Sequence, residues 1–299
     1  PRGAMHTARD VVRFALPGAE PFEVSKAALV ARAAFFGPAA DEAGSVDWSA
    51  DELAKVVSAL GPGASEQLPA VLRALGDPRD PPDWGVLLER CGLVRVFAVA
   101  HILGAAELLE QVRASAAGGG AESRLQRAVA ELRAEADEGA LRSALRHGFD
   151  RGSPVKLIHA AAAADAVEAL RIIVSEEDAL GDVAAAASAP GDVLSPLDIR
   201  DGSGRTALHL CAIHDCAAVA AVLIEASANL EALCDPPEEV EEEGAESGSV
   251  AIAKKFGIRT PLHLAALHDC AEVAQLLLER RANVAACLKA CPGAESGSV

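Results

Sequence analysis

Histidine, cysteine and aspartate side chains recur at matched positions in two parts of the C-terminal half of the chain. The first set is His209, Cys211, His214, Asp215 and Cys216, and the second is His263, His268, Asp269 and Cys270. Imidazole and thiolate groups are common ligands of structural zinc, which needs four of them in tetrahedral geometry. Stacked helices lie about 8–10 Å apart, so ligands from two neighbouring units could meet. The chain has no CxxC pair, however, and cysteine in alanine-rich helices usually behaves as a small buried hydrophobe. We therefore expect no metal site and no cofactor.

The chain also lacks the motifs of nucleophilic catalysis and of phosphate binding. Neither GxSxG nor GxxxxGK[ST] occurs in it. The glutamate-rich run 238–243 lacks the alternating oxygen ligands and the fixed glycine turn of a calcium loop. We expect no catalytic residues and therefore no enzyme.

The recurring histidines belong to a dodecamer that occurs twice. RTALHLCAIHDC (205–216) returns fifty-four residues later as RTPLHLAALHDC (259–270), with three differences. A catalytic site has no need of a second copy at this spacing, whereas a structural unit that stacks on a copy of itself does. We therefore ask which elements the two copies form.

Each copy predicts a pair of short helices. Thr206 and Thr260 can cap the first helix, and Pro261 suits a first helical position. The His-Asp pairs at 214–215 and 268–269 predict a turn in which Asp tolerates unusual backbone angles. The second helix carries a broad apolar stripe: Val219, Val222, Leu223 and Ile224, then Val273, Leu276, Leu277 and Leu278. One pair of helices cannot bury both its faces, so we expect the copies to stack.

These segments resemble a known repeat family. TALHLCA (206–212) and TPLHLAA (260–266) resemble the helix-start signature of the ankyrin repeat, and EVAQLLLERRANV (272–284) resembles its second helix. The resemblance implies a local hydrogen-bond network at each helix start, made by Thr206 with His209 and by Thr260 with His263.

The chain departs from the ankyrin pattern in its turns and in its spacing. Asp215 and Asp269 stand at the inter-helix turn, and Ser227 and Arg281 follow the second helix, where the family usually carries Gly. A non-Gly residue in a left-handed conformation costs roughly 1 kcal/mol. The family period is about 33 residues, so the excess, residues 236–256, is expected to be an acidic loop that leaves the stack.

Weaker copies precede the two dodecamers. KLIHAAAAADAVEALRIIV (156–174) aligns at an offset of fifty, which places His159 under His209 and Asp165 under Asp215. Residues 125–150 predict two amphipathic helices that stop near Gly148 and could cap the stack. We expect an ankyrin region over 124–299, with units near 125–150, 153–178, 203–235 and 257–289, insertions at 179–197 and 236–256, and a preceding linker at 114–123.

Residues 10–113 predict a small α+β domain. DVVRFAL and FEV are typical of the strands of a hairpin, while 25–36, 49–60 and 65–75 are expected to be helical, the last interrupted near Pro69. The pattern Phe22, Val24, Lys26, Leu29 and Phe35 or Phe36 resembles the start of the POZ fold of BTB domains and cullin adaptors, although Ala33 or Ala34 replaces the usual Ser. The alternative is an unrelated helical domain with a small sheet.

The fold class that we expect is mainly α: an ankyrin-type helical-hairpin solenoid preceded by the small α+β domain. Alanine is abundant and aromatic residues make up 3% of the chain, a composition that suits closely packed helices better than a β-sandwich.

The net charge and the cysteine content limit the classes of partner and the cellular compartment that we expect. The formal charge of −17 disfavours binding to nucleic acid, which needs clustered Lys and Arg, and adhesion to an anionic membrane. The longest apolar stretch, 92–109, carries Arg95, His101 and Glu107, which disfavours a bilayer span. Seven cysteines, an odd number, and no secretory leader predict a reducing intracellular compartment, the cytoplasm, with the nucleus left open.

The function expected from these features is a non-enzymatic scaffold or adaptor that binds a protein through stacked repeats. The expected partner-binding residues lie at turn tips and first helices: Arg200, Asp201, Ser203, Ile213, His214, Ile258, Leu267 and His268. The acidic charge favours a partner with a basic patch, and the POZ resemblance implies docking to a cullin-type ubiquitin ligase. The alternative is a regulatory fragment of a larger enzyme or channel whose catalytic or membrane part lies outside this chain.

Overall fold

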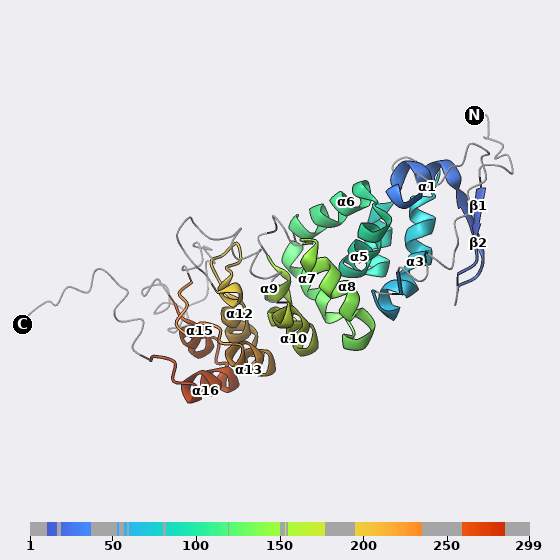
Figure 1. The fold of residues 1–299 in the computed structure, drawn as a ribbon. Helices are drawn as coiled ribbons and strands as arrows, with labels where there is room; N and C mark the ends of the chain where they lie inside the picture. Colours follow the sequence, from blue (N-terminus) through green and yellow to red (C-terminus); the bar gives the residue numbers. More distant parts are fainter. Residues whose placement is uncertain are drawn as a thin grey trace, which may run out of the picture. The chain divides into compact units, whose positions relative to one another are not determined.

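The computed structural model divides the chain into two compact units, residues 1–153 and 154–299. It describes residues 11–16, 19–36, 53, 57–58, 60–79, 82–118, 120–149, 153, 155–176, 195–234 and 259–284. Most of the expected helix 49–60, most of the insertion 179–197 and all of the insertion 236–256 therefore lie outside the described residues. Figure 1 shows the helices and strands of both units along the chain.

The first unit begins with the hairpin that the sequence predicts. Strands β1 (Val11–Phe14) and β2 (Phe22–Ser25) are antiparallel, with Phe14 opposite Phe22. The two rings stack with their centroids 5.6 Å apart. Phe14 and Val24 are buried while Arg13 and Glu23 are exposed, as the two-residue period of a strand requires when only one face is covered.

The helix expected over 25–36 ends earlier than predicted. Ser25 caps α1 (Lys26–Arg32) by accepting a hydrogen bond from Ala28 N–H, and the chain then turns through extended Ala33 into η1 (Ala34–Phe36). The Arg32 guanidinium donates to the carbonyl oxygens of Leu75 and Arg79. These tertiary contacts hold the end of α1, and the break turns Phe36 into the core, where it is 1% exposed.

The described helices of the first unit other than α1 surround α5 (Leu93–Leu103). They are α3 (Pro62–Leu75), α4 (Trp84–Cys91), α6 (Ala106–Ala117), α7 (Ala121–Ala130) and α8 (Ala134–Arg146), and each of them contacts α5. Residues Val96 to Ala100 are fully buried, as expected of a helix that is apolar on every side. The interruption predicted near Pro69 is absent, because α3 continues through that residue.

The segment 114–123, predicted to be a linker, differs in the structure. It contains the end of α6 and the start of α7, which pack against each other. Residues 125–150, expected to be a unit of the repeat stack, belong to the first unit instead: α8 packs on α5 and α3, and the Phe149 ring lies 5.2 Å from that of Phe97. The boundary between the units follows Ser153.

The described part of the second unit contains three helical hairpins in a row. They are α9 (Leu157–Ala163) with α10 (Val167–Ser175), α12 (Ala207–His214) with α13 (Ala217–Glu225), and α15 (Pro261–Leu267) with α16 (Ala271–Glu279). Helix α12 packs between α9 and α15, while α13 packs between α10 and α16. A short 3-10 helix, η2 (Pro196–Asp198), precedes the middle hairpin.

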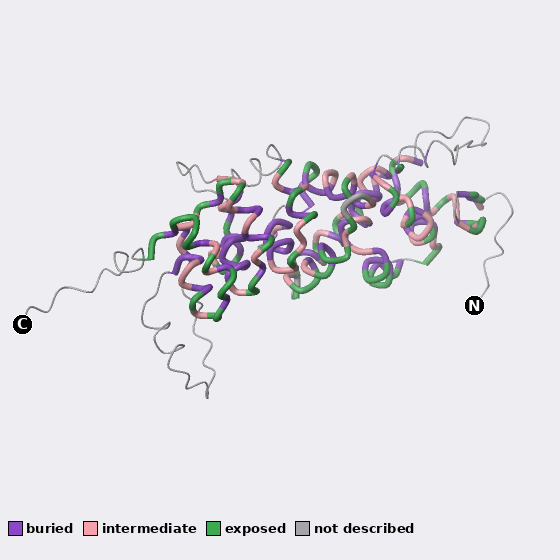
Figure 2. Tube along the Cα trace, turned by 90° about the horizontal axis from the view of Figure 1, so that it is seen from below, coloured by how far each residue is buried: buried purple, intermediate pink, exposed green. Residues whose placement is uncertain are grey.

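The middle hairpin, which has a neighbour on each side, is more deeply buried than the third hairpin. In the middle hairpin Leu208 is 1% exposed and Ala212 is fully buried, whereas Leu262 is half-buried and Ala266 is exposed at the same positions of the third hairpin. Figure 2 shows buried residues along the helices with exposed ones at the turns. Neighbours on both sides therefore supply the core that one hairpin lacks.

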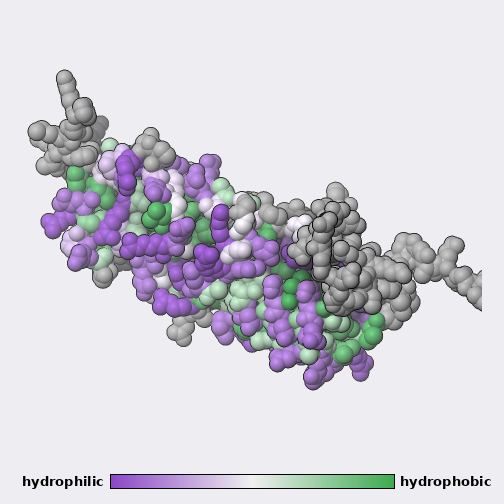
Figure 3. Space-filling view, turned by 180° about the vertical axis from the view of Figure 1, so that it is seen from behind, coloured by the Kyte–Doolittle hydropathy of each residue, from purple (hydrophilic) through white to green (hydrophobic). Residues whose placement is uncertain are grey.

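Most of the molecular surface on the face drawn in Figure 3 is hydrophilic, with hydrophobic residues in scattered patches. The exposed large hydrophobic side chains of the described segments are Val30, Val86, Leu278 and Val284. Among the helices described, none combines the length and the apolar character that crossing a membrane requires.

Candidate functional site

The helix start of the middle hairpin is held by the network of Thr206 and His209. His209 Nδ1 accepts a hydrogen bond from Thr206 N–H at 3.1 Å and lies 2.8 Å from the Thr206 hydroxyl. Since Nδ1 accepts, the ring proton is on Nε2, which donates to the Arg259 carbonyl oxygen at 3.1 Å. His209 is fully buried, and this burial lowers its pKa to about 4. At neutral pH it is an uncharged structural link to the third hairpin.

The two other hairpins repeat this arrangement with differences. In the third hairpin, His263 Nδ1 accepts from Thr260 N–H at 3.4 Å and lies 2.7 Å from the Thr260 hydroxyl. In the first hairpin, His159 Nδ1 accepts from Lys156 N–H, and Nε2 lies 2.9 Å from the Ile199 carbonyl oxygen. The first hairpin therefore keeps the hydrogen bond from the backbone N–H to the histidine, although Lys156 occupies the position of Thr206 and Thr260.

The turns keep left-handed backbone without glycine. Asp165, Asp215 and Asp269 have φ of 50°, 56° and 58° at the three inter-helix turns, and Ser227 and Arg281 have φ of 70° and 67° after the second helices. Aspartate tolerates this region better than most residues, whereas Ser and Arg pay a steric cost of roughly 1 kcal/mol or more. The departures from the glycine pattern therefore leave the turn shape unchanged and strain the backbone at Ser227 and Arg281.

Asp201 has a structural role that differs from the expected one. It is 8% exposed, and its Oδ1 accepts hydrogen bonds from the N–H groups of Ser203 and Arg205. Its Oδ2 pairs with the Arg205 guanidinium at 2.8 Å. Asp201 was expected to contact a partner, but these bonds commit it to closing the turn before α12. The DGSGR spacing, an Asx-type turn, is the signal that could have indicated this.

The remaining expected partner-binding residues lie at the surface to different extents. Arg200, Ser203, His214 and His268 are exposed, and Ile213 and Leu267 are half-buried. His214 and His268 occupy equivalent places in adjacent hairpins, directly before the Asp of each turn. Ile258 lies outside the described residues, but its neighbour Arg259 exchanges two backbone hydrogen bonds with Cys234.

A cavity of about 340 Å³ opens beside the residues that precede the middle hairpin. Its walls include Asp198 and Arg200 from one segment and Asn229 and Glu231 from the loop after α13. Asp198 accepts a hydrogen bond from Asn229 N–H, and burial raises the pKa of its carboxyl group. The cavity therefore carries charges of both signs, from Asp198 and Glu231 and from Arg200.

The repeated cysteines and histidines do not form a reactive centre. Burial raises the pKa of the Cys211 thiol well above 9.0 and that of the Cys216 thiol to about 11, so neither is a thiolate at neutral pH. Both ring nitrogens of His209 already have hydrogen-bond partners. Within the described part of the chain, no three His, Cys, Asp or Glu side chains are placed to hold a metal ion.

Comparison with known families agrees with the hairpin geometry. The ankyrin-repeat family model matches residues 203–235 and 259–288. These two segments are ankyrin repeats, and they contain the middle and third hairpins. No curated protein matches the chain. The matched residues all lie in the second unit, so the comparison gives no support to a POZ-like domain in residues 10–113.

Proposed function

We propose that this protein is a non-enzymatic adaptor whose ankyrin repeats bind a protein partner. The observation that carries the proposal is that each hairpin has buried side chains that pack on its neighbours and exposed side chains at its turn. Buried side chains such as His209 and Leu208 join one hairpin to the next, while His214 and His268 remain exposed at equivalent turns. Repeats that are tied together in this way present one continuous surface to a partner.

The proposed contact surface consists of Arg200, Ser203, His214 and His268. Arg200 lines the 340 Å³ cavity, and the two histidines precede the exposed carboxylates of Asp215 and Asp269. The chain as a whole carries a formal charge of −17. A partner with a basic patch would be steered toward these turns by the complementary field.

Affinity capture with the full chain tests the proposal. The test variant carries Arg200→Ala, Ser203→Ala, His214→Ala and His268→Ala. The matched control carries Arg171→Ala, Glu225→Ala and Glu272→Ala, which replace exposed residues on second helices of the hairpins. We expect proteins retained by the wild-type chain to be retained by the control and lost with the test variant. Equal retention by all three chains would contradict the proposed surface.

Recruitment to a cullin-type ligase is a narrower form of the same function. The hairpin β1–β2 leading directly into α1 supports it, because this arrangement matches the start of the POZ pattern. Mixing the full chain with a purified cullin and measuring their co-elution tests it. A reducing intracellular location fits this function, and the buried thiols of Cys91, Cys211, Cys216 and Cys270, which are free of disulfides, are consistent with such a compartment.

A further inference from the structure

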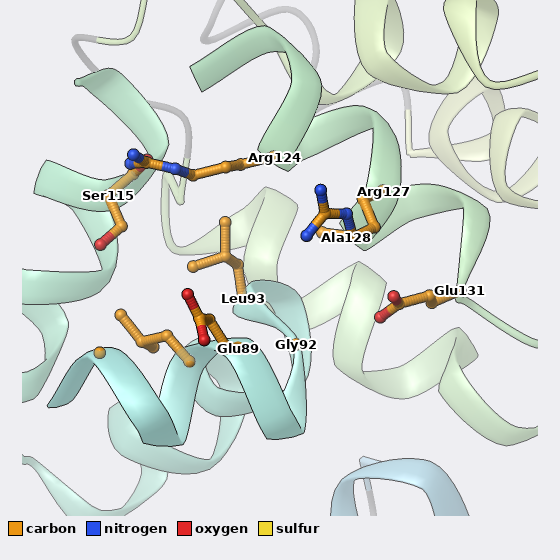
Figure 4. Close-up of a pocket in the computed structure, with 10 residues that line it drawn as sticks. Glu89, Gly92, Leu93, Ser115, Arg124, Arg127, Ala128 and Glu131 are labelled. Atoms are coloured by element: carbon orange, nitrogen blue, oxygen red, sulfur yellow. The ribbon is translucent and has the colours of Figure 1, made fainter. Parts of the chain in front are cut away.

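A second cavity, of about 280 Å³, lies within the first unit and contains none of the expected site residues. Helices α4, α5, α6 and α7 all contribute to its walls. Figure 4 shows Arg124 and Arg127 on one side of it, Glu89 on the opposite side and Leu93 between them. The cavity therefore combines an apolar floor with a charged rim.

The floor is formed by side chains that belong to the core of the unit. Leu88, Leu93 and Ala128 line the cavity and are 8%, 6% and 7% exposed. They offer a small apolar surface that an apolar side chain could cover. The floor also includes Gly92 and Leu93, the N-cap and first residue of α5, so the positive end of that helix dipole faces the cavity.

The rim carries two arginines three residues apart on α7. Arg124 is fixed by a hydrogen bond from Nη1 to the Ser115 carbonyl oxygen at 3.2 Å. The Arg127 guanidinium has no hydrogen bond or ion pair within the part of the chain that the structure describes, although Glu89 and Glu131 line the same cavity. An arginine that has been left unpaired in a strongly acidic chain is available to an anionic ligand.

The two glutamates decide which anion fits. Arg95 donates to the backbone carbonyl oxygen of Glu131, but its guanidinium is paired with Asp137 through two hydrogen bonds and so does not neutralise the Glu131 carboxylate. The carboxylates of Glu89 and Glu131 both line the cavity, and Glu89 lies opposite the arginines. A ligand with a single negative charge meets the guanidinium groups of Arg124 and Arg127 and the carboxylates of Glu89 and Glu131, whereas a phosphate dianion would double the repulsion from both carboxylates.

We infer that this cavity binds an acidic side chain of a partner peptide, with the carboxylate between Arg124 and Arg127 and a neighbouring apolar side chain on Leu88, Leu93 and Ala128. The site belongs to the first unit, and its argument is independent of the ankyrin repeats. It gives the chain a second binding surface whose preference, for acidic and apolar residues, is opposite in charge to that of the repeat surface.

The test is an amide chemical-shift titration of the full chain with three short peptides. The acetylated and amidated tripeptide Leu-Glu-Leu is the probe, Leu-Gln-Leu is its neutral counterpart, and Leu-phosphoserine-Leu is the dianionic one. We expect the glutamate peptide to shift the amides of Gly92, Leu93 and Ala128 in a saturable way. The neutral peptide should bind roughly tenfold more weakly, since charge-assisted hydrogen bonds are lost.

Variants separate the arginine contacts from general apolar binding. Arg127→Gln and Arg124→Gln are each expected to weaken the glutamate peptide roughly three- to tenfold, while Glu89→Gln should tighten it. Arg90→Gln is the matched control, because Arg90 is exposed on α4 and does not line the cavity. All four positions are exposed, so the variants should fold, which unchanged amide spectra elsewhere would verify.

Four results would overturn the inference. They are no shift of the cavity amides at millimolar peptide, equal binding of the glutamate and glutamine peptides, an equal effect of Arg127→Gln and Arg90→Gln, and tighter binding of the phosphoserine peptide than of the glutamate peptide. The last result would keep an anion site but contradict its assignment to a carboxylate.

Discussion

The Nε2 atom of His209 lies 3.1 Å from the carbonyl oxygen of Arg259, fifty residues further along the chain. This bond joins the middle and third hairpins, and Arg259 itself pairs with Cys234 through two backbone hydrogen bonds. Together they connect the two sides of segment 235–258. One buried imidazole therefore holds the first helix of its own repeat and the start of the next.

We expect the repeat stack to lose stability as the pH falls from about 6.5 to about 4. The folded pKa of His209 is about 4 and its ordinary value is 6.5, so protonation favours the unfolded chain. The stabilisation of the folded state that depends on neutral His209 is complete above pH 6.5, declines through this window and is lost below pH 4. The total loss in the free energy of unfolding is about 3 kcal/mol. Amide hydrogen exchange in α12, measured at several pH values, provides the free energy of opening.

His209→Gln identifies the residue responsible, because glutamine does not titrate. In this variant α12 should be less stable at pH 7 and less sensitive to pH than in the wild-type chain. His214→Gln, at an exposed position, should keep the full pH dependence. If His209→Gln and the wild-type chain lose the same free energy between pH 6.5 and 4, the cause lies elsewhere.

Asp201→Ala should destabilise the middle hairpin by about 3 kcal/mol. The substitution removes two hydrogen bonds to backbone N–H groups and the pairing with Arg205, each to a charged acceptor. Asp201→Asn keeps an acceptor for the N–H groups and should cost about half as much. Hydrogen exchange of α12 measures both effects. A variant Asp201→Ala as stable as the wild-type chain would show that the carboxylate is dispensable for the turn.

Ser227→Gly and Arg281→Gly should each stabilise the second unit by about 1 kcal/mol. Both residues have positive φ, where glycine carries no Cβ penalty. The preceding residues, Ala226 and Arg280, have φ of −79° and −89°, so Ala226→Gly and Arg280→Gly should instead destabilise it by about 0.5–1 kcal/mol. Denaturant-dependent hydrogen exchange in α13 and α16 compares the four variants. The opposite signs at adjacent positions are the decisive result.

Asp137→Asn should destabilise the first unit by about 3 kcal/mol. Asp137 is 1% exposed, and its carboxylate accepts two hydrogen bonds from Arg95 and one from Arg133 N–H. Neutralising it leaves Arg95 without its partner. Urea unfolding followed by tryptophan fluorescence measures this unit, because Trp84 is buried in it and Trp48, the other tryptophan of the chain, falls within the range 1–153.

The pair of Asp137 and Arg95 also predicts that the first unit loses stability at low pH. Burial opposes ionisation of Asp137, but the hydrogen bonds from Arg95 and Arg133 outweigh it and lower the pKa below 3.8. The stabilisation is therefore present above about pH 4 and is lost as the pH falls through the lower folded pKa. Gly63→Ala should also disturb the pair, since a Cβ there would clash with Asp137 Oδ1. A variant Asp137→Asn with unchanged acid sensitivity would contradict this account.

Much of the repeat architecture could be predicted from the sequence, because helix caps and turns depend on residues that are close together in the chain. Thr206 and Thr260 precede the first helices as capping residues do, and Asp215 and Asp269 adopt the left-handed turn. By contrast, the apolar stripe of the second helices is only partly buried. Val273 and Leu277 are fully buried, but Leu278 is 49% exposed, because burial depends on neighbours as well as on periodicity.

By itself, the sequence determined the helical hairpins, the histidine networks at their starts and the β-hairpin near the N-terminus. Each of these depends on residues that are close in the chain, where backbone geometry and capping act. Only the tertiary structure decided that α7 and α8 join the first unit, that Asp201 closes a turn and that Arg124 and Arg127 face a cavity with Glu89. These outcomes depend on contacts between segments far apart in the sequence, such as Arg95 with Asp137, and no local pattern encodes which distant partner a side chain will meet.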